Sequence, residues 1–136
     1  MSRRFEAAVI LVVERLRARG LDVNAMTPSQ YGGAAECSAG GFLVRVVDDR
    51  AFPYLTIAPP ITTLGEEPDW YPVDGILAYL GHPIDPDTKD VVRTELDALE
   101  QSWDRVVELC SAWKAEKASV VAFLRKRLLE SMKRNQ

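Results

Sequence analysis

The segment Gly40–Ile57 constrains the fold most, because it is the only long part of the chain that is dense in β-branched and aromatic residues. Phe42, Val44 and Val46 alternate with a more polar set of residues. Successive side chains of a strand point to opposite faces, so these three residues form one apolar face suited to a core. A second strand is expected from about residue 52 to residue 57. The segment therefore predicts a β-hairpin.

The break in this alternation predicts where the hairpin turns. Asp48, Asp49 and Arg50 are expected to form the turn, since aspartate side chains readily bond to their own backbone. Pro53 cannot donate to a β-ladder, so the second strand is expected to start there or to lie at an edge. Residues 34–37 can supply a preceding strand, which extends the hairpin to a meander.

Helical patterns surround this meander and complete a single α+β domain of 136 residues. We expect an N-terminal helix in residues 1–20, a small antiparallel β-meander of two to three strands in 34–58, and a short helix in 72–81. A long C-terminal helical region in 86–134 is expected to pack on the sheet. The stretch 58–72 is expected to be a loop stiffened by four prolines.

The C-terminal helical region has good start signals in Asp85 and Pro86, as an N-cap and a first helical residue. Its apolar residues then follow heptad spacing, and they are Val92, Leu96, Leu99, Trp103, Val106, Cys110 and Trp113. One continuous helix of about 70 Å would need a partner to cover this seam. The alternative, favoured for a compact domain, is a break near residues 117–119 with both halves on the sheet.

Few cysteine and histidine residues are present to bind zinc. Cys37 and Cys110 are the only cysteines and His82 is the only histidine, which excludes a structural zinc site. Two buried, reduced thiols are expected, and a disulfide between them is the alternative. No phosphate-binding loop or cofactor motif occurs, so we expect no cofactor and no metal.

Catalytic residues are not evident either. Paired carboxylates occur at Asp48-Asp49 and Glu66-Glu67, and such pairs can perform acid–base chemistry. No nucleophile–base pair accompanies them. We therefore expect a protein that is not an enzyme, with a small carboxylate-based enzyme as the remote alternative.

The apolar run Ala7–Val13 is too short for a membrane span and is followed at once by charged residues, unlike a signal peptide. A cytoplasmic protein without a membrane segment is expected.

The net charge of −3 conceals an uneven distribution. Residues 1–20 carry +3 and residues 117–136 carry +5, whereas residues 21–116 carry −11. The acidic middle disfavours nucleic acid and would attract a basic protein, although a merely soluble acidic face is the alternative.

The acidic middle contains a loop in which carboxylates and aromatic rings are neighbours. Aromatic residues supply contact area and carboxylates steer a basic partner. The alternative for Trp70 is that it fills the core where the loop meets the next helix. The predicted partner-binding residues are Asp48, Asp49, Glu66, Glu67, Asp69, Trp70 and Tyr71.

About a third of the chain, FLVRVVDDRAFPYLTI and DWYPVDGILAYLG, resembles small bacterial immunity-type proteins of polymorphic-toxin and toxin–antitoxin systems. The residues that carry the resemblance are Arg45, Asp49, Arg50, Trp70, Tyr71, Ile76 and Leu80. It implies a cytosolic protein without shared catalytic residues. Such a protein binds and neutralises a toxin, often by presenting acidic residues to a basic surface.

Two functions are therefore expected to compete. The first is a protein-binding module for a partner such as a basic toxin domain. The second is a self-associating structural or chaperone-like protein, a homodimer through the heptad seam that includes Val92, Leu96, Leu99, Trp103, Val106 and Trp113.

Overall fold

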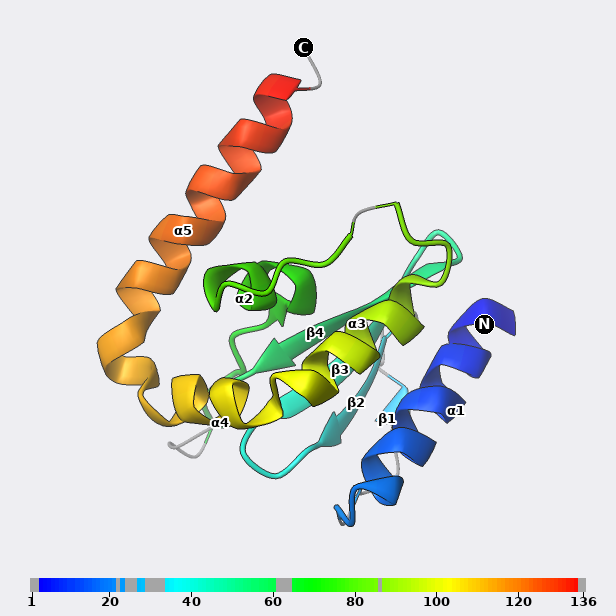
Figure 1. Cartoon of the computed structure of the whole chain (residues 1–136). Helices are drawn as coiled ribbons and strands as arrows, with labels where there is room; N and C mark the ends of the chain where they lie inside the picture. Colours follow the sequence, from blue (N-terminus) through cyan, green and yellow to red (C-terminus); the bar gives the residue numbers. More distant parts are fainter. Residues whose placement is uncertain are drawn as a thin grey trace.

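The computed structural model describes residues 3–21, 23, 27–28, 34–60, 65–85 and 87–134. Its five antiparallel strands follow chain order in the sheet, and they are β1 (Thr27–Pro28), β2 (Ala34–Ser38), β3 (Leu43–Asp49), β4 (Phe52–Ala58) and β5 (Tyr71–Pro72). The helices are α1 (Arg3–Ala18), α2 (Val73–Tyr79), α3 (Val91–Gln101), α4 (Trp103–Ser111) and α5 (Trp113–Arg134). Figure 1 shows α1 and α3 beside each other over one face of the sheet, while α5 runs past α2 and extends away from the rest. The predicted α+β class is confirmed, and the two short outer strands were not predicted.

The β3–β4 hairpin provides the central part of the core. Val44 and Val46, with the preceding Phe42, are completely buried, which confirms the apolar face predicted from the alternation. Val46 lies opposite Leu55, which is also buried. The helices α1 and α3 both contact this hairpin, so the core lies between the sheet and one helical layer.

The turn of this hairpin differs from the prediction. Asp48 and Asp49 are part of β3, and the turn consists of Arg50 and Ala51 alone. Both have positive φ angles, 53° and 69°, as a two-residue hairpin turn of type I′ requires. The prediction placed the turn too early and assigned only Arg50 to it correctly, because neither Arg nor Ala is a usual residue at such positions.

The outer edge of β4 is covered in three different ways. Ile57 pairs with Tyr71 of β5. Two residues earlier, the backbone N–H of Leu55 donates to Oε1 of Glu95 on α3 at 2.9 Å. Alternate residues of a strand direct their backbone groups to the same side, so Pro53 is the next in this series, and it has no N–H to donate. The expectation that Pro53 lies at an edge fits this arrangement.

The C-terminal region begins later than predicted. Asp85 accepts a hydrogen bond from the backbone N–H of Asp87 in a local turn, and Pro86 lies outside the described residues. The N-cap is instead Asp90, whose side chain accepts from the backbone N–H of Arg93. Asp85 was a misleading start signal because aspartate stabilises turns as readily as helix N-termini.

The same region is divided into three helices by single residues. The break predicted near residues 117–119 is wrong, since these residues lie inside α5. The breaks are at Ser102, with φ −107° and ψ 16°, and at Ala112, with φ −98° and ψ 19°. Neither conformation needs glycine or proline, so sequence inspection for those residues could not locate them.

The heptad seam packs on the chain's own sheet. Val92, Leu96, Leu99, Trp103, Val106 and Cys110 are all buried. Trp103 contacts Phe42, with ring centroids 4.7 Å apart. Trp113 is half-buried. Before this seam could form an interface with a second copy of the chain, its residues would have to leave the core.

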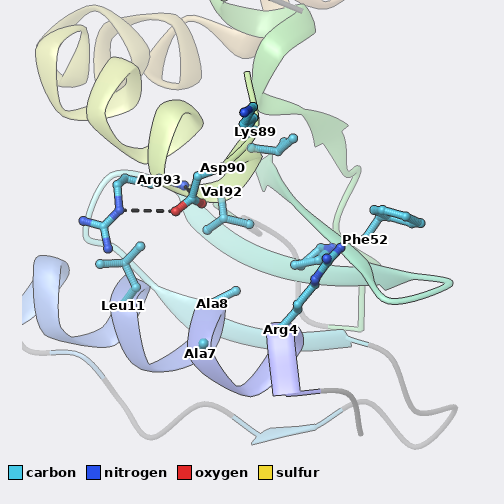
Figure 2. Close-up of a pocket in the computed structure, with 11 residues that line it drawn as sticks. Arg4, Ala7, Ala8, Leu11, Phe52, Lys89, Asp90, Val92 and Arg93 are labelled. Carbon is cyan, nitrogen blue, oxygen red and sulfur yellow. Dashed lines mark hydrogen bonds and ion pairs between the residues drawn. The ribbon is translucent and has the colours of Figure 1, made fainter. Parts of the chain in front are cut away.

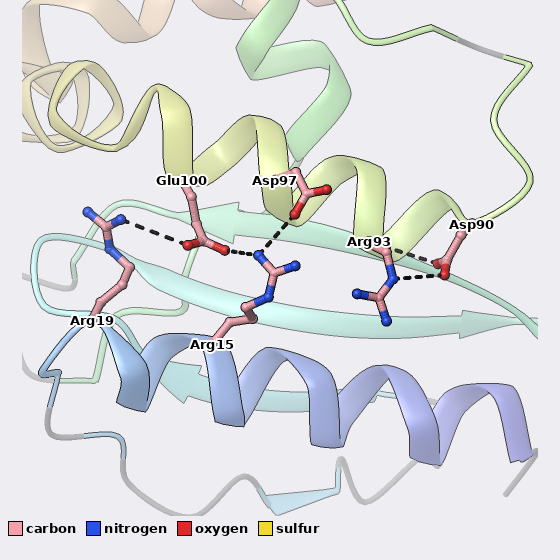
Figure 3. A network of polar contacts seen from close by, with 6 residues as sticks. All are labelled: Arg15, Arg19, Asp90, Arg93, Asp97 and Glu100. Carbon is pink, nitrogen blue, oxygen red and sulfur yellow. Dashed lines mark hydrogen bonds and ion pairs between the residues drawn. The ribbon is translucent and has the colours of Figure 1, made fainter.

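Ion pairs link α1 to α3 at the surface above this core (Figure 3). Nη1 of Arg15 lies 2.6 Å from Oε1 of Glu100 and 2.9 Å from Oδ1 of Asp97. Arg19 approaches the other oxygen of Glu100 at 4.0 Å. The hydrogen bonds to these carboxylates raise the pKa of Arg15, so the bridging guanidinium remains charged.

The helix α5 docks on α2 through contacts that extend from Glu116 to Arg127. A Cβ atom placed on Gly75 would lie 2.6 Å from Cδ2 of Leu124, so the glycine permits this close approach. The hydroxyl of Tyr79 donates to Oε2 of Glu116 at 2.8 Å, and the Tyr79 ring meets Phe123 edge-on at 5.5 Å. Beyond this contact, three large apolar side chains are more than half exposed, and they are Leu128, Leu129 and Met132.

None of the helices in the described part of the chain has the length and apolarity needed to cross a bilayer. Cys37 and Cys110 are buried free thiols, as expected, and burial raises the pKa of each to about 11.

Candidate functional site

The acidic loop that precedes β5 lies against the start of α5. Nζ of Lys117 donates to Oδ2 of Asp69 at 2.9 Å, and this bond raises the pKa of Lys117. Glu66 and Glu67 are exposed, and neither forms an ion pair with another described residue. One carboxylate therefore anchors the loop, while two remain directed to solvent.

The two aromatic residues of the loop are held by different partners. The guanidinium of Arg45 lies 4.5 Å from the ring centre of Trp70, and Nε of Arg45 donates to Thr56 at 3.2 Å. The rings of Tyr71 and Trp113 are 5.1 Å apart. Trp70 and Tyr71 are both half-buried, so Trp70 covers the sheet without entering the core. Burial, together with the nearby charge of Asp69, raises the pKa of Tyr71.

A groove of about 500 Å³ separates this loop from the α4–α5 junction. Glu66, Glu67 and Asp69 line one side, and Pro59, Pro60 and Pro68 add apolar surface. Trp113, Lys114 and Lys117 line the other side. We call this feature the acidic groove. It combines exposed carboxylates with apolar surface, which suits a ligand that carries positive charge beside apolar groups.

Asp48 and Asp49 do not belong to the acidic groove. They end β3 beside the turn, whereas the groove adjoins the opposite end of the sheet, near Gly41. Six residue steps of a strand span about 20 Å. The seven predicted binding residues are therefore divided into a group of five around the loop and a separate pair at the hairpin turn.

Sequence reasoning missed the most unusual carboxyl group, that of Glu95. It is only 4% exposed, and burial raises its pKa to about 8, against the opposing effect of the hydrogen bond from Leu55. The nearby charge of Asp74 raises the pKa further. Glu95 is thus mostly protonated at neutral pH. Its carboxyl group accepts the hydrogen bond from the Leu55 N–H at the outer edge of β4. The only signal for it in the sequence was an acid next to the apolar seam residue Leu96.

Metal chemistry receives no geometric support within the part of the chain that is described. No group of three or more His, Cys, Asp or Glu side chains lies close enough together there to hold a metal ion.

Comparisons with family models, with curated proteins and with solved structures found no match for this chain.

Proposed function

We propose that the chain is a non-enzymatic protein-binding module that holds a basic partner in the acidic groove. The observation that carries the proposal is the exposure of Glu66 and Glu67 at the edge of a groove with apolar lining. Partner side chains would displace water from the prolines and Trp113, while their cations approach the two carboxylates. The resemblance to immunity-type proteins makes a toxin domain the class of partner to test first.

The electrostatic field of the chain supports the same proposal. Residues 21–116 carry −11, and the described residues that line the groove belong to this segment, except Lys117. Long-range attraction of this kind raises association rates with basic proteins and weakens as salt is added. Lys114 and Lys117 on the opposite side reduce the local charge, and they add selectivity against partners that are merely polycationic.

The test is capture of partners from lysate of the native host at moderate salt, followed by mass spectrometry. The variant Glu66→Lys/Glu67→Lys is expected to lose one basic protein that the wild type retains. The matched control is Glu6→Lys/Glu14→Lys, which changes the net charge equally at exposed positions of α1. Equal loss with both variants would show that binding depends on the net charge of the chain and not on the acidic groove. That result would contradict the proposal.

The immunity-type assignment needs a second experiment. The captured partner is expressed alone and together with the chain. Growth that is arrested by the partner and restored by the wild-type chain, but not by the groove variant, supports neutralisation of a toxin. If the partner is harmless when expressed alone, the immunity-type role is excluded and only the binding role is supported.

A second candidate function is self-association, which is favoured by the exposure of Leu128, Leu129 and Met132 on α5. This surface replaces the buried heptad seam as the place where two copies would meet. The solution mass tests it directly, because a mass equal to one chain at micromolar concentration would exclude a stable homodimer.

A further inference from the structure

A second pocket, at the other end of the molecule from the acidic groove, has the opposite charge. It has a volume of about 420 Å³ and lies between α1, the start of β4 and the start of α3 (Figure 2). This volume is within the range of small-molecule sites. Among the described residues, Arg4, Lys89 and Arg93 line it together with one carboxylate, Asp90. We call it the α1–α3 pocket.

The single carboxylate is already engaged. Asp90 caps α3, and its Oδ2 lies 3.4 Å from Nε of Arg93. Lys89 forms no ion pair with any other described residue, and Arg4 lies over the ring of Phe52, 5.5 Å from its centre. Figure 2 shows Arg4 rising from α1 toward Phe52, while Lys89 and Arg93 come from the α3 side. Two cations on opposite sides are thus available to an anion.

The other described residues that line the pocket are apolar. Ala7, Ala8 and Leu11 of α1 face Val92 of α3 in the pocket. At its border, Phe52 is 66% exposed and Val91 is 40% exposed. Large apolar side chains at the border of a concave site gain stability when a ligand removes them from water.

We propose that the α1–α3 pocket binds a small amphipathic anion, a carboxylate carried on an acyl or aromatic group. The carboxylate is held between Arg4 and Lys89, and the apolar part lies against Ala7, Val92 and Phe52. The charge of the lining, opposite to that of the acidic middle of the chain, directs anions to this place. The site is separate from the acidic groove, and its occupation does not depend on the proposed protein partner.

Decanoate tests the proposal, with acetate as the ligand that lacks an apolar part. Decanoate is expected to shift the backbone amide resonances of Ala7, Ala8, Val91 and Val92 in a saturable manner, and acetate at equal concentration is not. Arg4→Glu/Lys89→Glu is expected to weaken decanoate binding by about tenfold or more, because two attractive charges become repulsive. Ala7→Leu, which fills the pocket without changing any charge, is expected to have a similar effect.

Arg17→Glu/Arg125→Glu is the control, since it reverses two exposed cations outside the pocket. It is expected to leave decanoate binding within about twofold of wild type, because distant exposed charges are screened. Equal weakening by both double variants overturns the proposal. Resonance shifts confined to Leu128 and Met132 also overturn it, since decanoate would then bind the apolar surface of α5. Binding of acetate as tight as that of decanoate would show that the apolar residues of the pocket do not contribute to binding. It would thereby overturn the proposal of an amphipathic ligand.

Discussion

The helices α3 and α5 come from one stretch without glycine or proline, yet they differ in what covers their apolar residues. Leu96 and Leu99 of α3 are completely buried against the sheet. Leu128 and Leu129 of α5 are 62% and 53% exposed. An apolar stripe shows that a helix needs a partner, but α3 packs on the chain's own sheet along its length, whereas α5 docks on α2 and leaves these two leucines exposed. The difference teaches that heptad spacing identifies a buried surface without identifying an intermolecular one.

The largest effect that tests this comparison is truncation of a leucine in each helix. Leu96→Ala is expected to lower the free energy of unfolding by about 3 kcal/mol, since it removes buried contacts and leaves a cavity. Leu128→Ala is expected to change it by less than about 0.5 kcal/mol. Urea unfolding followed by circular dichroism measures both. Equal losses would mean that Leu128 is buried in solution, for instance by a second copy.

The next effect concerns Glu95, which gives α3 a pH dependence. Its pKa in the folded chain is about 8, above its ordinary value of 4.5, so the folded state retains a proton that the unfolded state loses. The stabilisation that Glu95 contributes is therefore complete below about pH 4.5 and is lost as pH rises through 8. Glu95→Gln is expected to remove this fall, which is on the order of 3 to 4 kcal/mol between pH 5 and 8.

Urea unfolding at both pH values measures this difference. Glu95→Ala is the companion variant, because it removes the acceptor for the Leu55 N–H and should be less stable than Glu95→Gln at either pH. An identical pH slope in wild type and Glu95→Gln would show that Glu95 is ionised in the folded chain.

A smaller effect separates the docking of α5 from the stability of the core. Gly75→Leu is expected to displace Leu124 and to loosen α5 while the α1–α3 layer is retained. Amide hydrogen exchange in residues 113–124 should become roughly tenfold faster, corresponding to about 1.4 kcal/mol of local stability. Ala122→Leu, at an exposed position of α5, is the control and should leave exchange unchanged. Faster exchange throughout α3 would show that the two regions unfold together.

The smallest effects are expected from the surface arginines that join the helices. Arg15→Met removes the link from α1 to Glu100 and Asp97, and Arg127→Met removes the link from α5 to Asp74. Exposed ion pairs contribute little, so both variants should unfold close to the wild-type urea midpoint. Arg15→Met is expected to have the larger effect because Arg15 contacts two carboxylates. A larger loss from Arg127→Met would indicate that α5 depends on charge more than on packing.

Local patterns predicted much of this fold. The alternation around Val44 predicted the hairpin and its buried face, and the apolar spacing from Val92 predicted the buried stripe of α3 and α4. The hairpin turn was expected at Asp48-Asp49-Arg50 and lies at Arg50-Ala51, because it uses residues that rarely adopt positive φ. The breaks at Ser102 and Ala112 were missed because ordinary residues adopt their conformations.

The candidate site was predicted only where its residues are neighbours in the chain. Glu66, Glu67 and Asp69 share one loop, so their proximity was available from the sequence. Their position across the groove from Trp113 and Lys117 depends on the direction that α5 takes after α4, and no local sequence pattern predicts that direction. Glu95 was missed for the same reason, since its contact with Leu55 joins residues 40 positions apart.

The cover along the outer edge of β4 also bears on how the chain behaves at high concentration. An uncovered strand edge is a template on which another molecule can add a strand, and this is a common route to aggregation. That template is interrupted at three residues of β4. Pro53 has no N–H, the N–H of Leu55 is bonded to Glu95, and Ile57 is paired with the short strand β5. Intermolecular sheet growth here would have to break the bond to Glu95. Raising the pH through 8 places a buried charge at this bond, and it is therefore expected to favour the addition of strands from other molecules at this edge.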